Sequence, residues 1–132
     1  MTRLVADASA IVDLLSRAPR AAAIRTELAA VAELDVPEHF HVEAISALRG
    51  LLRRRDLSPE RADRALDLLL ALRVVRHPVA PLARDVWALR EGLTAYDAAY
   101  LALSRALDAR VLTTDRGLAA AARKDRRLVE LR

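Results

Sequence analysis

The sequence contains no cysteine, and of its 22 basic residues only Lys124 is a lysine. The absence of cysteine excludes disulfide bonds and thiolate metal sites, and it suits a reducing compartment. No apolar run approaches the roughly 20 residues that a transmembrane helix needs. The first residues also lack the apolar stretch and cleavage site of a signal peptide. We therefore expect a cytoplasmic protein with no membrane partner.

Charge and composition narrow the class of protein further. The chain has 132 residues, a net charge of +4 and a pI of about 10.5, which favours a polyanionic partner such as nucleic acid. An excess of arginine can also follow from genomic base composition, so charge supports nucleic acid only weakly. With 54% hydrophobic and 30% charged residues the chain is not a disordered polyampholyte. Its length predicts a single domain over 1–132.

Short apolar stretches alternate with helical patterns along the chain, without an internal repeat or a linker. Strands are expected at 3–7, 34–36, 73–76 and 110–113, with a last edge strand at 128–131. Helices are expected to start near Ser9, Pro19, Glu38, Ser58, Pro81, Thr94 and Leu118. This alternation predicts an α/β fold with a parallel sheet and helices on both faces.

The stretch 94–118 combines a helix, a short strand and a carboxylate directly after it. Thr94 can cap the helix, and Asp97 completes a capping box. Arg110-Val-Leu-Thr113 reads as a strand that Asp115 stops. The start of such a helix and the end of the following strand share one edge of a parallel sheet. We therefore expect Asp97 and Asp115 at the same edge, where open α/β sheets bind ligands.

Two further acids belong to that edge in the same interpretation. Asp7 ends the first strand, and Glu43 lies near the start of the helix that follows the second. Carboxylates about 4 Å apart repel by about 4 kcal/mol at an effective dielectric of 20. Such a cluster must take up protons or bind a hard cation, Mg²⁺ or Mn²⁺. The structural alternative is that each acid is a cap; for Asp97, Thr94 alone would explain it.

Four segments in this order resemble one known family. They are V-A-D-A-S around Asp7, V-P-E-H-F-H-V-E-A-I-S-A-L-R around Glu43, L-T-A-Y-D-A-A-Y around Asp97 and L-T-T-D-R-G-L around Asp115. Over essentially its whole length the chain resembles PIN-domain ribonucleases, and within them the VapC-type toxins of bacterial toxin–antitoxin pairs. The resemblance implies a three-layer α/β/α sandwich with a central parallel sheet of four to five short strands.

The resemblance also implies an activity and partners. The protein would be a metal-dependent endoribonuclease that cleaves single-stranded regions of RNA with Mg²⁺, or alternatively Mn²⁺, as the ion. Its partners would be a VapB-type antitoxin and a second copy in a homodimer. The alternative is a non-catalytic α/β RNA-binding or receiver-like module with a structural metal site.

The resemblance assigns roles to individual residues. Asp7, Asp97 and Asp115 would be the main metal ligands, and Glu43 would complete the catalytic cluster. Ser9 and Thr113 would hydrogen-bond the carboxylates, and Arg116 is a candidate substrate-binding residue.

Apolar and aromatic positions give expectations about packing. Trp87, Tyr96 and Tyr100 lie in helical apolar patterns, so we expect them in the core rather than stacked on RNA bases. Val42, Ile45, Leu48 and Leu52 form one apolar face of the helix that begins near Glu38. Leu66–Leu72 is apolar nearly all round, which indicates either a buried helix or a contact with a second copy or an antitoxin.

Overall fold

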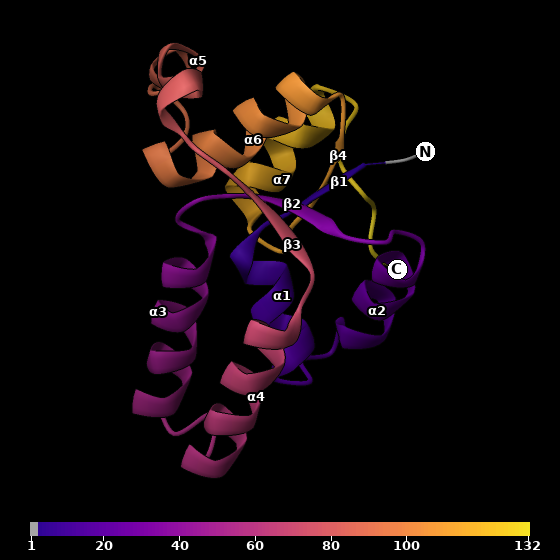
Figure 1. The fold of residues 1–132 in the computed structure, drawn as a ribbon, viewed down its shortest axis with the longest axis vertical. Helices are drawn as coiled ribbons and strands as arrows, with labels where there is room; N and C mark the ends of the chain where they lie inside the picture. Colours follow the sequence, from indigo (N-terminus) through magenta and orange to yellow (C-terminus); the bar gives the residue numbers. More distant parts are fainter. Residues whose placement is uncertain (1–2) are drawn as a thin grey trace.

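The computed structural model describes residues 3–132 and has a central sheet of four parallel strands in the order β3-β2-β1-β4 (Figure 1). The strands are β1 (Leu4–Ala6), β2 (Leu34–Pro37), β3 (Val74–His77) and β4 (Arg110–Leu112). Every pairing between neighbours is parallel. The predicted α/β class with a short-stranded parallel sheet is therefore confirmed, with four strands.

Helices cover both faces of this sheet. They are α1 (Ala8–Leu15), α2 (Ala21–Ala29), α3 (Phe40–Arg53), α4 (Pro59–Ala71), the short 3₁₀ helix η1 (Ala80–Leu82), α5 (Ala83–Ala88), α6 (Ala95–Leu107) and α7 (Arg116–Lys124). Helices α1 to α4 pack together on one side, and α5 to α7 lie on the other (Figure 1). Within residues 3–132, no helix combines the length and the apolar character that crossing a bilayer requires.

The core runs through the middle of the sheet and helix α6. The three residues of β1 are all fully buried. All side chains from Ala98 to Ser104 on α6 are buried as well, since the helix packs against β1, β2 and β4 and against α5 and α7. A helix buried on most of its circumference must be apolar nearly all round, and α6 is.

Side-chain caps fix the starts of α6 and α4. Thr94 accepts a hydrogen bond from the Asp97 amide at 3.2 Å, and Ser58 accepts one from the Arg61 amide at 3.2 Å. Both caps match the sequence-based prediction. The sequence also offers Ser9 as the cap of the first helix, but this is wrong, because α1 already begins at Ala8 and Asp7 occupies the capping position. The Ser9 hydroxyl is therefore free for another partner.

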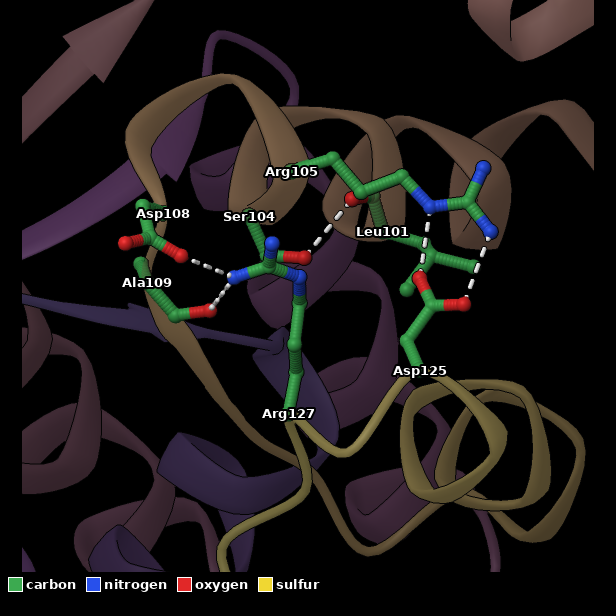
Figure 2. Close-up of polar contacts among 7 residues, drawn as sticks. All are labelled: Leu101, Ser104, Arg105, Asp108, Ala109, Asp125 and Arg127. Atoms are coloured by element: carbon green, nitrogen blue, oxygen red, sulfur yellow. Dashed lines mark hydrogen bonds and ion pairs between the residues drawn. The ribbon is translucent and has the colours of Figure 1, made fainter.

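Ion pairs fasten the end of α7 to α6. Arg105 on α6 binds both carboxylate oxygens of Asp125, directly after α7 (Figure 2). Arg127 donates to Asp108 Oδ1 at 2.9 Å and to the Ala109 carbonyl at 3.3 Å. Asp108 itself ends α6 in the left-handed region, with φ of 50°. These contacts hold α7 in a fixed position relative to the sheet.

The predicted edge strand at 128–131 is wrong. The segment makes a single parallel bridge, Val111 to Leu128, rather than a strand. Two backbone hydrogen bonds hold it, from the Val111 amide to Arg127 and from the Val129 amide to Val111. Arg126 has φ of 59°, so the chain turns directly before the bridge.

Several apolar side chains expected in the core are exposed instead. On α3 the buried side chains are Phe40, Ala44 and Leu48, whereas Val42 is 71% and Ile45 46% exposed.

On the other side of the sheet, Trp87 is 68% and Tyr96 60% exposed, so the prediction that they lie in the core is wrong. Tyr100 is fully buried, as predicted. Near the end of α4, Leu68 and Leu70 are exposed while Leu69 is buried. The structure thus leaves apolar side chains of α3, α4 and α5 uncovered.

Candidate functional site

Four acids lie at the edge of the sheet where the strands end, and we call them the acidic site. Asp7 follows β1, and Asp115 comes shortly after β4, which pairs with β1. Glu43 lies in the first turn of α3, which follows β2. Asp97 lies in the first turn of α6. The parallel topology therefore brings all four predicted residues to one edge.

Two hydroxyl groups orient the carboxylate of Asp7, which is only 4% exposed. Ser9 Oγ donates to Asp7 Oδ2 at 2.6 Å, and Thr113 Oγ1 donates to the same oxygen at 2.7 Å. Each hydroxyl oxygen also accepts a backbone amide, from Thr114 and Asp115 respectively. Because an ionised carboxylate can only accept, both hydroxyls donate their single proton to Asp7, although the two hydroxyl oxygens also lie 3.2 Å from each other. The expected hydrogen bonds of Ser9 and Thr113 are present, and their catalytic role stays a prediction.

Glu43 is held by two residues to which sequence reasoning gave no such role. The Tyr100 hydroxyl donates to Glu43 Oε1 at 2.7 Å. His39 Nε2 lies 3.3 Å from the same oxygen, close enough for an ion pair but not aligned as a hydrogen bond. The His39 ring packs edge-on against Tyr96 and Tyr100. In the sequence, the four-residue spacing of His39 and Glu43 on a helical pattern indicates the contact between these two residues.

The pKa values report that the four acids share one electrostatic field. The pKa of Asp97 is raised to about 6, chiefly by burial. The charges of Asp115, Asp7 and Glu43 contribute to the same upward shift. Burial also raises the pKa of Asp7 above its ordinary value, against the hydrogen bonds from Ser9 and Thr113. Glu43 and Asp115 add to this upward shift. The charges of Glu43 and Asp115 therefore act on both Asp7 and Asp97, which places the four carboxylates in one electrostatic field.

The neighbourhood of Glu43 also affects His39. The Glu43 carboxylate, both as a polar partner and as a charge, raises the pKa of His39 above its ordinary value, against the opposing effect of burial. A protonated His39 would offset one negative charge of the acidic site.

The donor set suits a hard divalent cation, although no three acidic or histidine side chains within residues 3–132 stand at coordination spacing. The candidate ligands are all oxygens, as Mg²⁺ prefers. Local hydrogen bonds occupy one oxygen each of Asp7, Glu43 and Asp115, whose Oδ2 accepts the Leu118 amide at 2.9 Å. Their second oxygens accept no hydrogen bond from residues 3–132. A cation would use these oxygens and relieve the repulsion that raises the pKa of Asp97.

Two hollows border the acidic site. One, of about 560 Å³, we call the arginine cleft; it is lined by Asp13, Arg20, Thr113, Thr114, Asp115, Arg116, Ala119 and Arg123. The other, of about 580 Å³, lies between α1 and α3 and reaches Glu43 and Ser9. Asp13 belongs to both. Arg116, predicted to bind substrate, thus lies beside the acidic site and is exposed.

Comparison with known proteins places this arrangement in a family. The family model of the PIN domain matches residues 4–124 of this chain. Ribonuclease VapC3 of Mycobacterium tuberculosis is 39% identical over 120 residues, which cover 90% of this chain and 87% of that protein. Ribonuclease VapC1 of the same organism is 38% identical over 122 residues, 92% of each chain.

Solved structures agree on the fold. The crystal structure of Mycobacterium tuberculosis VapC20, described as a sarcin-ricin loop cleaving toxin, superposes with a TM-score of 0.68 at 20% identity and covers 89% of this chain and 94% of that one. PAE2754 from Pyrobaculum aerophilum gives a TM-score of 0.64 at 26% identity, with 90% of this chain and 78% of that one covered. The chain therefore belongs to the PIN-domain family and, within it, to the VapC ribonucleases.

Proposed function

We propose that the protein is a Mg²⁺-dependent endoribonuclease that hydrolyses phosphodiester bonds in single-stranded regions of RNA. It would act in the cytoplasm as the toxin of a type II toxin–antitoxin pair. The observation that carries this proposal is the convergence of Asp7, Glu43, Asp97 and Asp115 on one field, in a chain whose relatives are named ribonucleases.

The roles of the acids follow from their surroundings. Asp7, Asp97 and Asp115 would hold the metal, directly or through water, with the free oxygens of Asp7 and Asp115 facing it. A bound Mg²⁺ or Mn²⁺ supplies an acidified water and neutralises charge on the phosphate. Ser9 and Thr113 keep Asp7 in one orientation. Glu43, fixed through Oε1 by Tyr100, has Oε2 available to accept a proton from the attacking water.

Substrate binding would use the surface around these acids. The chain carries a net charge of +4, which favours a polyanion. Arg116 adjoins Asp115 and would contact the RNA strand next to the scissile bond. Attack of water on phosphorus with cleavage of the P–O3′ bond, the 3′ oxygen leaving as the alcohol, would give a 5′-phosphate and a 3′-hydroxyl.

Two protein partners belong to the proposal. As a VapC-family toxin the protein would be inhibited by a VapB-type antitoxin. It would also form a homodimer, and the exposed side chains of Val42, Ile45 and Leu52 on α3 support this, because a monomer gains nothing from leaving them in water.

The direct test is incubation of the pure protein with mixed single-stranded and structured RNA, with Mg²⁺, with Mn²⁺ and with EDTA. We expect metal-dependent cleavage at unpaired positions, with products that carry 5′-phosphates. The Asp7→Asn chain, purified in parallel, controls for contaminating nucleases. If no RNA is cut under any metal condition, the non-catalytic RNA-binding alternative takes the place of this proposal.

A further inference from the structure

The arginine cleft collects positive side chains from three places in the chain. Arg20 directly precedes α2, Arg116 is the first residue of α7, and Arg123 lies two turns further along α7. Residues seven apart on a helix share one face, so Arg116 and Arg123 both border the hollow. The cleft thus has arginines on two walls and joins the acidic site at Asp115.

The three arginines differ in how they are paired. Arg123 binds Glu130 with its Nε 3.0 Å from Oε1. The guanidinium groups of Arg20 and Arg116 make no hydrogen bond or ion pair with any residue in 3–132, and both side chains are exposed. A guanidinium offers five donors in a planar fork that matches a phosphate. Arg20 and Arg116 are therefore the two residues of the cleft with donors to spare.

The walls of the cleft are fixed rather than loose. Asp115 caps α7 through the Leu118 amide at 2.9 Å. At the other end, the bidentate pair of Arg105 with Asp125 ties α7 to α6 (Figure 2). The base of the side chain of Arg116 is therefore held in place before any ligand binds, which lowers the entropy lost on binding.

A polyanion that reaches the acidic site needs positive charge close by. Asp7, Glu43, Asp97 and Asp115 repel phosphates, and the arginine cleft is the hollow beside them that contains unpaired cations on two walls. The second hollow is lined by Ser9, Glu43 and their neighbours. Its one basic lining residue is Arg54, which is paired with Asp56. The charge distribution therefore favours a strand path past Asp115 rather than past Glu43.

We propose that the arginine cleft is a phosphate-binding subsite, in which Arg20 and Arg116 bind the RNA backbone on the Asp115 side of the scissile bond. The subsite rests on the proposed function in that its ligand is the RNA strand. Arg123 contributes less than the other two, because Glu130 already neutralises it.

The test measures binding of a fluorescently labelled single-stranded RNA to the Asp7→Asn chain in Mg²⁺ over a series of salt concentrations. One phosphate contact on a single strand accounts for a slope of about −0.7 in log K against log salt, or about fivefold in affinity at about 0.1 M salt. We expect Arg20→Gln and Arg116→Gln each to weaken binding about fivefold and to flatten the slope by about 0.7. We expect Arg123→Gln to do less.

The matched control is Arg64→Gln. Arg64 is exposed on α4 and does not line the cleft, and its substitution removes the same charge. If the double variant of Arg20 and Arg116 binds RNA as tightly as the Arg64→Gln chain, the subsite does not exist. If substitution of these arginines instead weakens binding of a carboxylate-rich antitoxin peptide and leaves RNA binding unchanged, the assignment to RNA is overturned.

The outcome can be separated from the fate of the proposed function. Loss of RNA affinity in the arginine variants supports the subsite even if the protein with intact Asp7 cuts no RNA. In the active protein the subsite predicts a raised KM with kcat unchanged, since the arginines bind a phosphate that neighbours the scissile bond and not the reacting phosphate itself. A fall in kcat at constant KM would contradict it.

Discussion

The hydroxyl of Tyr100 on α6 donates a 2.7 Å hydrogen bond to Oε1 of Glu43 on α3, joining two residues 57 positions apart. Tyr100 is fully buried, so its ring cannot turn to another partner without opening the core. Burial and the charges of Glu43 and Asp7 raise the pKa of Tyr100, so the hydroxyl keeps its proton and remains a donor. The core of the protein thus sets the orientation of one acid in the acidic site.

The first prediction concerns this bond. Tyr100→Phe keeps the ring and removes the donor, so Glu43 is freed to change its orientation. We expect kcat for RNA cleavage to fall roughly 10- to 150-fold, in line with the roughly 1.5–3 kcal/mol of a hydrogen bond to a charged group, while KM changes less than about twofold. Tyr96→Phe is the matched control, because Tyr96 is 60% exposed. Equal kcat values in the two variants would show that the bond does not matter for catalysis.

The second prediction concerns metal binding by Asp7. Asp7→Asn removes the negative charge and keeps the shape of the side chain. Burial raises the pKa of Asp7, which shows that the charged form is destabilised by desolvation in the folded protein. We expect cleavage to be lost while the melting temperature in EDTA stays equal to or rises above that of the parent protein. Mg²⁺ at ten times its dissociation constant should stabilise the parent by about 1.4 kcal/mol. The variant should lose most of this increment, as measured by thermal melts with and without Mg²⁺.

A melting temperature that responds to Mg²⁺ equally in both proteins would contradict the metal role of Asp7. Asp67→Asn, an exposed change on α4, supplies the control for the loss of one negative charge.

The third prediction concerns the pH dependence of stability. Asp35 on β2 accepts hydrogen bonds from Arg3 Nη2 at 2.9 Å and contacts His77 Nε2 on β3 at 2.8 Å. Burial alone opposes its ionisation, but the hydrogen bonds and charges of Arg3 and His77 outweigh burial, so the pKa of Asp35 lies below its ordinary value. The charged form is therefore favoured in the folded state. Its stabilisation is present above the unfolded pKa of about 3.9 and is lost as pH falls through the lower folded value.

We expect Asp35→Asn to lower the free energy of unfolding by about 1–3 kcal/mol at pH 7. Urea denaturation at pH 7 and at pH 3 measures this, and the difference between variant and parent should shrink at the lower pH. Asp56→Asn, whose partner Arg54 is 65% exposed in its side chain, should change stability by less than about 0.5 kcal/mol at either pH. A loss for Asp35→Asn that is the same at both pH values would contradict the ionic origin.

The fourth prediction concerns assembly. Val42 and Ile45 are 71% and 46% exposed on α3, so replacing them with glutamate removes little packing within one chain. We expect the double variant Val42→Glu, Ile45→Glu to be a folded monomer by light scattering where the parent is a dimer. Arg64→Glu, on the exposed surface of α4, should leave the mass unchanged. A dimer that survives the double change would show that α3 does not form the contact.

The positions of the four acids were readable from the sequence because they depend on local rules. A strand that ends in a carboxylate, as at Asp7, places it at the carboxyl edge whatever the strand order is. Thr94 and Ser58 cap their helices through amides three residues away, and so needed no tertiary information. Parallel strands joined by helices then bring such residues together, and this follows from the alternation of elements alone.

Tertiary structure decided which apolar faces are covered and which polar side chains meet. Helical periodicity places Val42, Ile45, Leu48 and Leu52 on one face. The packing of α1 and α4 against α3 decides that only Leu48 of these four is buried, together with Ala44. Trp87 is likewise 68% exposed, with only the Arg90 guanidinium of the described residues over its ring, 4.7 Å from the centroid. The Tyr100–Glu43 bond and the meeting of Arg20 with Arg116 depend on how separate elements are placed in space. Spacing along a chain determines which side chains share a face, whereas contacts between elements depend on distances that no local pattern contains.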